Sequence, residues 1–462
     1  MAKGLCVILC RQSGNMGFVR CSWQPLKFTM LIVSSLLLLL FGAINIHCST
    51  APQNSTDMLS LLQFKQAITS DPREVLKSWN SSVDHCQWIG VSCSSRRHPR
   101  RVTTLNLTGQ NLEGQISPSL GNLTFLVYLI LSSNSIFGHF PALNRLRRLQ
   151  AIDLRNNKLQ EFAPDALTNT SKLIYLDLSA NLLAGPISKN IGFLSSLRVL
   201  ILKGNMFTGI IPSTLQNITQ LGQLDLSDNK LEGTIPEELG EGQLSLIKLN
   251  LGNNVLSGRV PTSIFNRSSL VVLGLYSDFL YMELPSNIGN TLPMLSQLML
   301  YKNTFQGPIP ASLGNASLLS AIDLTSNNFT GQVPSSLGRL LLLTFLKLEK
   351  NSLEANDSKS WEFLDALSNC SSLQLLSLSD NQLQGPIPNS IGKLSAGFEF
   401  LGLTRNNLWG PVPASMGNLT RLLILTLDKN NLTGPIGPWV RNMQNLGGLD
   451  LSENSFTGAI PS

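Results

Sequence analysis

Asp153 and Asp177 are the residues whose type and spacing most suggest catalysis, because both occur in the same local sequence context. Paired carboxylates can serve as the acid and the base of glycoside hydrolysis. The same context recurs at Asp225, Asp323 and Asp450, so aspartate is the favoured residue of a repeated pattern. This recurrence favours a structural role for the carboxylates.

Other catalytic and metal-binding motifs are missing from the sequence. Beyond the first 50 residues the histidines are His85, His98 and His139, and no Ser–His–Asp or Cys–His set is apparent. The sequence has no G-x-x-x-x-G-K phosphate loop, no kinase H-R-D or D-F-G signature, and no metal ligands at finger-like spacing. We therefore expect no enzymatic activity, no cofactor and no metal site.

A group of aromatic and charged residues suggests binding chemistry instead. The group stands at positions that should face outward from β-strands, where aromatic side chains and cations are typical interface anchors. Its members are Tyr276, Met299, Tyr301, Lys302, Phe345, Lys347, Glu349 and Lys350. Arg155, Lys203 and Lys248 form a second candidate strip. We hypothesise that the first group is a ligand face; a solvated surface with scattered aromatics is the alternative.

The cysteines and glycosylation motifs indicate an exported protein. Cys86 and Cys93 are close in sequence and flank Trp88, so we expect them to form a disulfide, with Cys370 left as a buried thiol or paired between molecules. Asn-x-Ser/Thr motifs become glycosylation candidates in a secreted chain. They are Asn54, Asn80, Asn106, Asn122, Asn169, Asn217, Asn266, Asn315, Asn328, Asn356, Asn369, Asn418 and Asn431.

One repeated pattern, L-x-x-L-x-L-x-x-N-x-L-x-G-x-I-P, organises the chain from about residue 102 onward. Its second apolar residue serves as a register mark, and the marks are mostly 23 to 25 residues apart. The fifteen marks are Leu105, Leu129, Ile152, Leu176, Leu200, Leu224, Leu249, Leu273, Leu298, Ile322, Leu346, Leu376, Leu401, Leu425 and Leu449. This period and pattern predict an α/β solenoid, a leucine-rich-repeat (LRR) horseshoe with a parallel β-sheet on its concave face. Successive strands should stack about 4.8 Å apart.

The asparagine of each repeat should turn inward, where its amide both donates to and accepts from the backbone of the turn. Two repeats break this rule, with Gln110 in the first and Asp278 in the eighth. Because an ionised aspartate cannot donate, and because Met282 replaces the usual glycine in the same repeat, we expect a weaker joint at the eighth repeat. The eleventh repeat carries an insertion that predicts a short helix around Trp361 to Leu367 on the convex side.

Residues 50–101 are predicted to cap the N-terminal end of the stack, covering the apolar side chains of the first repeat. In "DMLSLLQFKQAI", Leu61, Phe64 and Ile68 share one face of a predicted helix. In "DPREVLKSW", Asp71 is expected to begin a second helix as its N-cap, with Pro72 at the first position and Glu74 completing a capping box. Trp79 and Trp88 would then cover the open end.

Residues 1–49 have the layout of a secretory signal with an extended basic segment, since Lys27 precedes the apolar run Met30 to Ile46 and polar residues follow. An uncleaved membrane anchor is the alternative. Four cations and no acid lie in the first 48 residues, which leaves 30 basic and 28 acidic residues in the rest of the chain. So small an excess gives no electrostatic case for nucleic-acid binding.

The repeats occupy residues 102–462, and the chain stops inside the fifteenth at "SENSFTGAIPS". A hydrophobic repeat without a cap is expected only in a fragment or a truncated product. Any membrane contact would then come from the leader or from a missing C-terminal segment.

Three sequence features resemble the extracellular part of plant LRR receptor-like kinases. These are the "LxGxIP" half-repeat, the cap segment "SWNSSVDHCQWIGVSC", and the insertion "NDSKSWEFLDALSNCSSLQLLSLSDNQLQG". The insertion is similar to subfamily XII, which contains the flagellin, elongation-factor-Tu and rice bacterial-blight resistance receptors. The resemblance covers about residues 55 to 462. It implies perception of a peptide or protein, often a microbial one, at the cell surface, together with a co-receptor of the short-LRR kinase type.

The leading interpretation is therefore the ligand-binding ectodomain of a receptor in defence or signalling, exported to the extracellular face of the plasma membrane. A full-length relative would carry a Ser/Thr kinase domain, which this chain lacks. A secreted LRR inhibitor or decoy resembling polygalacturonase-inhibiting proteins is the alternative. A structural wall or matrix protein is a third, without a supporting low-complexity segment. The genomic sequence downstream of Ser462 would discriminate between receptor and inhibitor.

Overall fold

The computed structural model of the chain describes residues 56–95, 99–162, 164–167, 169–241 and 245–459. The predicted leader, His98 and the sequon at Asn54 lie outside the described residues. Residues Gln53–Ser462 make one compact unit. Within it, no described helix combines the length and the apolar character needed to cross a bilayer.

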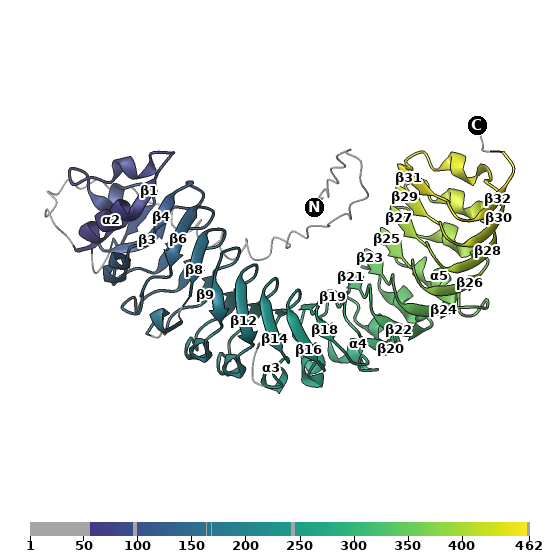
Figure 1. The fold of residues 1–462 in the computed structure, drawn as a ribbon, viewed down its shortest axis with the longest axis horizontal. Coiled ribbons are helices and arrows are strands. Elements are labelled where there is room, and N and C mark those ends of the chain that lie inside the picture. The colour runs from purple at the N-terminus through teal and green to yellow at the C-terminus, as the bar shows by residue number, and fades with distance from the viewer. Residues whose placement is uncertain (1–55, 96–98, 163, 168, 242–244, 460–462) are drawn as a thin grey trace. The chain divides into compact units, whose positions relative to one another are not determined.

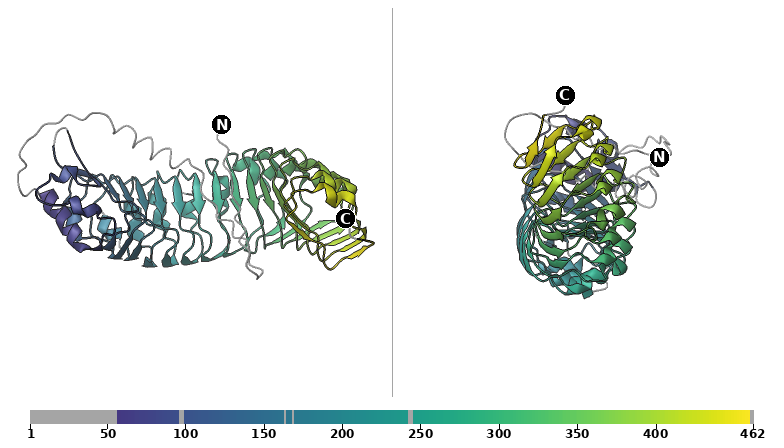
Figure 2. Two further views of the ribbon diagram at one scale, coloured as in Figure 1. Left: turned by 90° about the horizontal axis from the view of Figure 1, so that it is seen from above. Right: turned by 90° about the vertical axis from the view of Figure 1, so that its right-hand side faces the viewer.

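The inner face of this unit is a 16-stranded sheet, whose strands follow one another in chain order (Figures 1 and 2). The first strand, β2 (Val91–Cys93), belongs to the cap and pairs antiparallel with the second, while the remaining fifteen are parallel. They are β3 (Val102–Asn106), β5 (Tyr128–Ile130), β7 (Ala151–Asp153), β9 (Tyr175–Asp177), β11 (Val199–Ile201), β13 (Gln223–Asp225), β15 (Lys248–Asn250), β17 (Val272–Gly274), β19 (Gln297–Met299), β21 (Ala321–Asp323), β23 (Phe345–Lys347), β25 (Leu375–Ser377), β27 (Phe400–Gly402), β29 (Ile424–Thr426) and β31 (Gly448–Asp450).

All fifteen register marks lie in these strands and pair directly with one another, from Leu105 against Leu129 to Leu425 against Leu449. Fourteen of the marks are at most 1% exposed, whereas Leu449 in the last described inner strand is 42% exposed. The predicted period therefore corresponds to one strand and one layer of core per repeat. The LRR solenoid fold is confirmed.

A second set of strands forms two lateral sheets beside the inner one (Figure 1). The first contains β1 (Ile68–Ser70), β4 (Glu113–Gln115), β6 (Ser135–His139), β8 (Lys158–Glu161), β10 (Ala184–Pro186), β12 (Met206–Ile210), β14 (Lys230–Gly233), β16 (Val255–Gly258) and β18 (Phe279–Leu280). The second contains β20 (Gln306–Pro308), β22 (Asn328–Gly331), β24 (Ser352–Ala355), β26 (Gln382–Gly385), β28 (Asn407–Pro411), β30 (Asn431–Pro435) and β32 (Ser455–Thr457).

The two lateral sheets meet at the eighth repeat through the single bridge between Glu283 and Gln306. In most repeats the glycine of L-x-G takes a positive φ, for example 77° at Gly233 and 88° at Gly258. Met282 at the corresponding position has no such φ, since a side chain disfavours the left-handed region. The lateral strand of this repeat is accordingly only two residues long.

Short helices return the chain on the outer side of most repeats; the second repeat has only turns there. Most are single 3₁₀ turns, as expected where a return must be brief. They are η3 (Pro118–Asn122), η4 (Pro164–Leu167), η5 (Lys189–Phe193), η6 (Ser213–Asn217), η7 (Thr262–Asn266), η8 (Ala311–Asn315), η9 (Ser335–Arg339), η10 (Asn389–Lys393), η11 (Ala414–Asn418) and η12 (Pro438–Asn442), with the α-helical turns α3 (Glu238–Glu241) and α4 (Ile288–Thr291). The predicted helix of the eleventh repeat is confirmed as α5 (Glu362–Leu367), with Trp361 as its N-cap.

The N-terminal cap begins with α2 (Thr56–Ala67), which confirms the first predicted cap helix and buries Leu61 and Phe64 fully. Ile68 is not part of the helix; it begins β1, which pairs antiparallel with β4. Trp79 and Trp88 are both buried, as predicted, and their rings are stacked with centroids 5.4 Å apart.

The second predicted cap helix, beginning at Pro72, is wrong. The chain forms a turn there, followed by the 3₁₀ helix η1 (Val75–Ser78), with Glu74 in the left-handed region at φ 52°. The Asp71 carboxylate accepts hydrogen bonds from the N–H groups of Val75 and Leu76. Asp71 therefore satisfies backbone donors further along the chain than a capping box requires, and Glu74 forms an exposed ion pair with Lys77 instead.

Candidate ligand-binding face

Tyr276 and Tyr301, which follow β17 and β19, form a stacked pair of aromatic side chains on the inner face. Their rings lie parallel, 4.7 Å between centroids and 11° between planes. Gly252 of the preceding repeat provides the space, because a Cβ there would lie 2.6 Å from the Tyr276 ring. The sequence-predicted aromatics of repeats eight and nine are thus stacked on each other along the sheet.

The Tyr276 side chain interacts with groups of the preceding repeats: Asn250 in the seventh, Ser227 in the sixth and Lys203 in the fifth. Burial raises the pKa of its hydroxyl, although the hydrogen bond with Asn250 and the charge of Lys203 act in the opposite direction. Burial, followed by the proximity of Tyr276, also raises the pKa of Tyr301. Both side chains therefore stay neutral and available as hydrogen-bonding aromatics at physiological pH.

The remaining predicted residues of this face belong to two places. Met299 lies in β19 beside the tyrosine stack, and Lys302 occupies the following turn with φ 55°. Two repeats further on, Phe345 and Lys347 lie in β23, and the Glu349 carboxylate accepts a hydrogen bond from the Ser377 hydroxyl. Lys350 follows in the corresponding turn, also with φ 55°. Strand β21, with Ala321 and Asp323, separates the two groups.

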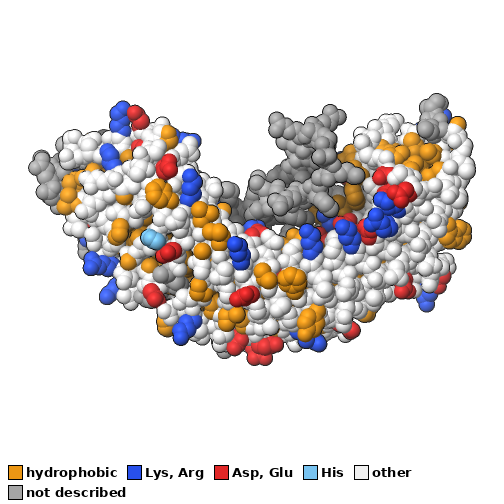
Figure 3. Space-filling model, in the orientation of Figure 1, with side chains coloured by type: hydrophobic (Ala, Val, Ile, Leu, Met, Phe, Trp, Pro, Cys, Tyr) orange, Lys and Arg blue, Asp and Glu red, His pale blue; other side chains and the backbone are white. Residues whose placement is uncertain are grey.

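A column of apolar side chains on the C-terminal inner strands extends from the predicted Phe345 to Leu375, Phe400 and Ile424, three residues that were missed from the sequence. Phe345 pairs with Leu375, Leu375 with Phe400, and Phe400 with Ile424 across β23, β25, β27 and β29. All four are partly exposed. They immediately precede the register marks, so the outward position before each mark is the signal that could have found them. Figure 3 shows hydrophobic patches on the C-terminal repeats, beyond a row of lysine and arginine side chains along the inner edge.

The second candidate strip is locally paired with acids. The Nζ atom of Lys203 lies 3.2 Å from Asp228, and that of Lys248 lies 3.2 Å from Asp225. Arg155 bridges Asp153 at 3.6 Å and Asp177 at 3.7 Å. These cations neutralise carboxylates of the sheet, which makes them weaker ligand contacts than the sequence suggests.

Asp153 and Asp177 form a network of the sheet, in agreement with the structural interpretation. The Asp177 carboxylate accepts hydrogen bonds from the Tyr175 hydroxyl and from Ser179, and only 2% of the residue is exposed. Burial raises the pKa of Asp153 to about 6, opposed by the charge of Arg155. Asp177 and Asp225 are both buried, although they stand at strand positions that alternate with the inward leucines.

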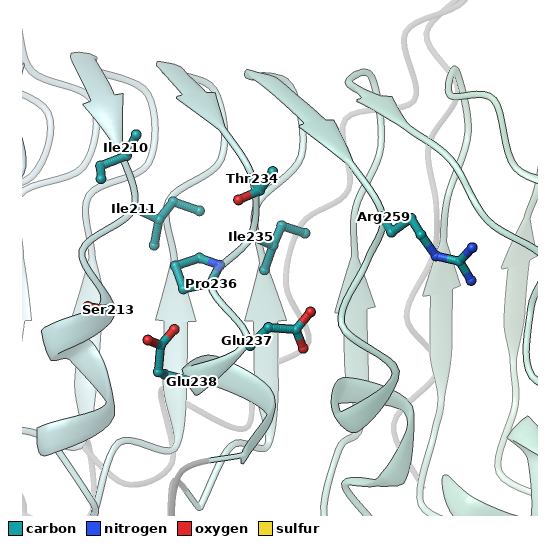
Figure 4. A pocket seen from close by; sticks show the side chains of 9 residues that line it. All are labelled: Ile210, Ile211, Ser213, Thr234, Ile235, Pro236, Glu237, Glu238 and Arg259. Atoms are coloured by element: carbon teal, nitrogen blue, oxygen red, sulfur yellow. The ribbon is translucent and has the colours of Figure 1, made fainter.

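Two other features could have carried chemistry. A shallow hollow on the lateral side is lined by Ile210, Ile211, Ser213, Thr234, Ile235, Pro236, Glu237, Glu238 and Arg259, and Figure 4 shows Arg259 pointing away from the glutamates. Its polar groups do not converge.

In the cap, the side-chain ligand atoms of His85, Cys86 and Cys93 lie within 4.8 Å of one another, but the two cysteines form a disulfide and offer no thiolate to a metal. Cys370, the remaining cysteine of the described residues, is a buried free thiol.

Among the described sequons, every asparagine is exposed except Asn122, which is half-buried and accepts a hydrogen bond from Arg145. The Asn122 side chain is therefore the most hindered of the candidate glycosylation sites.

Comparison with known families agrees with this architecture. The family described as "Leucine rich repeat N-terminal domain" matches residues 54–94, and the family "Leucine Rich Repeat" matches residues 196–218, 220–241, 318–340 and 372–394. These matches identify an N-terminal LRR domain and leucine-rich repeats within the chain.

Its curated relatives are plant receptor kinases. The LRR receptor-like serine/threonine-protein kinase EFR of Arabidopsis thaliana is 47% identical over 122 residues, which are 26% of this chain and 11% of the relative. The receptor kinase-like protein Xa21 of Oryza sativa subsp. japonica is 51% identical over 82 residues, 17% of this chain and 8% of the relative. The aligned segments thus span about a tenth of these relatives and include no kinase region. The features are consistent with the ectodomain of a plant LRR receptor-like kinase.

Solved structures show the same fold. A crystal structure of a TDR receptor has a TM-score of 0.67 at 28% identity, covering 77% of this chain and 65% of that chain. The plant peptide hormone receptor RGFR1 in complex with RGF2 has a TM-score of 0.59 at 27% identity, covering 80% and 72%. The Arabidopsis receptor kinase HAESA, in complex with the peptide hormone IDA and the co-receptor SERK1, has a TM-score of 0.54 at 26% identity, covering 88% and 83%.

Proposed function

We propose that this chain is the extracellular ligand-binding part of an LRR receptor-like kinase in defence or signalling, and that it binds a peptide or protein on the inner face of repeats eight to fourteen. Support comes from the similar ectodomains whose descriptions name peptide hormones as ligands. A short-LRR kinase co-receptor is proposed on the same basis, since the HAESA complex contains SERK1.

The observation that carries the proposal is the preformed Tyr276–Tyr301 stack. Two large aromatic rings are already held in one orientation by Gly252 and by each other, so a ligand would not need to order them on binding. Such preorganised aromatic side chains are the usual anchors of protein interfaces, because they supply contact area at little entropic cost. The apolar column from Phe345 to Ile424 would extend the contact toward the C-terminal repeats.

Peptide capture by the glycosylated, exported chain tests this proposal. The purified protein is immobilised, exposed to fractionated plant and microbial peptides, and the retained peptides are identified by mass spectrometry. For a retained peptide, Tyr301→Ala and Phe345→Ala should each weaken binding by tenfold or more, as expected for interface anchors worth about 2 kcal/mol.

The matched control is Tyr128→Ala, because Tyr128 is a half-buried tyrosine on the inner sheet in β5, far along the chain from the proposed face. If neither Tyr301→Ala nor Phe345→Ala changed the affinity for the peptide, the assigned ligand face would be contradicted. If Tyr128→Ala weakened binding as much as these two variants, the location of the face on repeats eight to fourteen would be contradicted.

A further inference from the structure

The asparagine ladder of the inner turns begins after Gln110 in the first repeat and is interrupted at Asp278 in the eighth. In the regular part of the ladder, each leucine carbonyl accepts two amide hydrogens, one from the asparagine of its own repeat and one from that of the next. The Leu131 carbonyl, for example, accepts from the Nδ2 atoms of both Asn134 and Asn157. The pattern recurs from repeat to repeat and holds again at Leu300, which accepts from Asn303 and Asn327.

The two carbonyls beside Asp278 each lack one of these partners. Among the asparagine side chains, only Asn254 donates to the Leu251 carbonyl, and only Asn303 donates to that of Leu275. An asparagine at position 278 would supply both missing hydrogens. Asp278 occupies that position, so these oxygens face a carboxyl group where the ladder elsewhere places an amide.

The two oxygens of Asp278 are in unequal environments. Oδ1 accepts hydrogen bonds from the N–H groups of Asn254 at 3.1 Å and Leu256 at 3.0 Å, as an asparagine oxygen would. Oδ2 is buried with no hydrogen-bond partner, and the whole residue is only 8% exposed. A charged oxygen in this position has lost its hydration without compensation, whereas a protonated one becomes a donor among carbonyl acceptors.

The groups around Asp278 offer no charge to balance it. From the seventh repeat, the Asn254 and Leu256 backbone donors face it. From the ninth repeat, the Lys302 carbonyl accepts from the Asp278 N–H while the Lys302 side chain is exposed, and the amide of Asn303 is neutral. On its own turn the titratable group is Tyr276, stacked on Tyr301, and the more remote Asp228 accepts from Asn253. Within the described chain, no cation forms an ion pair with Asp278.

Burial therefore raises the pKa of Asp278 to about 7, opposed by the hydrogen bonds from Leu256 and Asn254. An ordinary aspartate titrates near pH 4. The folded joint thus holds the proton more tightly than an opened one. Ionisation of Asp278 therefore destabilises the closed joint relative to an opened one. This free-energy cost is absent below about pH 4, grows as the pH rises toward about 7, and is complete above that pH.

The same joint supports the tyrosine stack. The Asn253 N–H donates to the Tyr276 carbonyl, and Gly252 lies beneath the Tyr276 ring, so the turn that Asp278 ties to the eighth repeat also carries the stack. An ionised Oδ2 can gain hydration only if this turn moves apart from the eighth repeat.

We propose that Asp278 is a proton-operated latch between repeats seven and eight: protonated by solvent, it supplies one of the two hydrogens that an asparagine would provide and closes the joint, and deprotonated, it loosens the joint under the Tyr276–Tyr301 stack. Its effect on ligand affinity rests on the proposed function, whereas the latch itself does not.

Hydrogen exchange of the exported chain, followed by mass spectrometry at about pH 5 and about pH 8, tests the latch without any ligand. After correction for intrinsic rates, peptides covering residues 252–258 and 276–282 should lose protection by tenfold or more at the higher pH. Asp278→Asn, which restores the residue used in the other repeats, should abolish this loss. Asn327→Asp should create a similar loss in the tenth repeat.

Asp323→Asn is the matched control, because Asp323 also has a raised pKa but lies on the sheet face, outside the ladder. This variant should leave the pH dependence of hydrogen exchange in residues 252–258 unchanged. Equal pH dependence in the unmodified chain and in Asp278→Asn would overturn the latch. If hydrogen exchange shows the expected pH dependence but Tyr301→Ala does not change the affinity for a captured peptide, the proposed function is contradicted and the latch is not.

Discussion

At the scale of single residues, glycines of the inner sheet decide where large side chains can rest. Gly252 has no positive φ, so its value lies in the missing Cβ and not in backbone freedom. Any side chain there would collide with the Tyr276 ring. The aromatic stack is therefore encoded in two repeats at once, by the tyrosine of one and the glycine of its neighbour.

Gly252→Ala should displace Tyr276 and break the stack with Tyr301. The cost is about 1–3 kcal/mol, the usual penalty for forcing an extra carbon into a packed site, together with loss of the near-ultraviolet circular dichroism of the tyrosine pair. Gly222→Ala is the control, since a Cβ there meets no atom closer than 3.7 Å. A spectrum unchanged in Gly252→Ala would show that the ring does not lie on the glycine.

The ladder asparagines are also decisive single residues. Asn327 donates to the carbonyls of Leu300 and Leu324 and accepts from the Phe305 N–H, all in a buried setting. Asn327→Ala leaves these groups unsatisfied and should lower the free energy of unfolding by about 3 kcal/mol. Chemical denaturation measures this, with Asn287→Ala as the control because Asn287 is exposed and makes no side-chain cap hydrogen bond. Equal stability of the two variants would refute the role of the ladder.

At the scale of elements, the cap is joined to the first repeat by a buried carboxylate. Asp57 in α2 is 1% exposed and accepts hydrogen bonds from the Arg101 guanidinium and from the Val102 N–H at the start of β3. Its position explains why α2 lies against the first repeat and covers its leucines. The Cys86–Cys93 disulfide closes the other side of the cap.

Asp57→Ala should uncouple the cap, because it leaves a backbone donor and a guanidinium without their buried acceptor. The expected loss is about 3 kcal/mol, against nearly none for Glu74→Ala, which removes only an exposed ion pair with Lys77. Limited proteolysis of residues 56–93 provides the measurement. The prediction fails if the two variants are cleaved at the same rate.

At the scale of the whole unit, each repeat contacts mainly its neighbours, so length grows with repeat number. We expect small-angle scattering of the exported chain to give a radius of gyration well above about 22 Å, the value for a compact domain of 410 residues. A value near that of a compact domain would contradict the stacked arrangement of the inner sheet.

The sequence alone determined the repeat register, the asparagine ladder and its break at Asp278, the disulfide of the cap, and the helices at residues 57–67 and 362–367. These features depend on local spacing, because one repeat contains the strand, the turn and the return that it encodes. The first cap helix was predictable for the same reason, from apolar side chains spaced along one helical face.

Tertiary structure alone decided which outward side chains meet. Tyr276 and Tyr301 stack across two repeats, and the column from Phe345 to Ile424 unites four more; their positions can be read from the repeat, but their mutual contacts cannot. The cap turn after Asp71 was mispredicted because its carboxylate reaches donors beyond a capping box. The strand spacing brings residues about 24 positions apart into contact, and their sizes and charges then decide which of them remain exposed to a ligand.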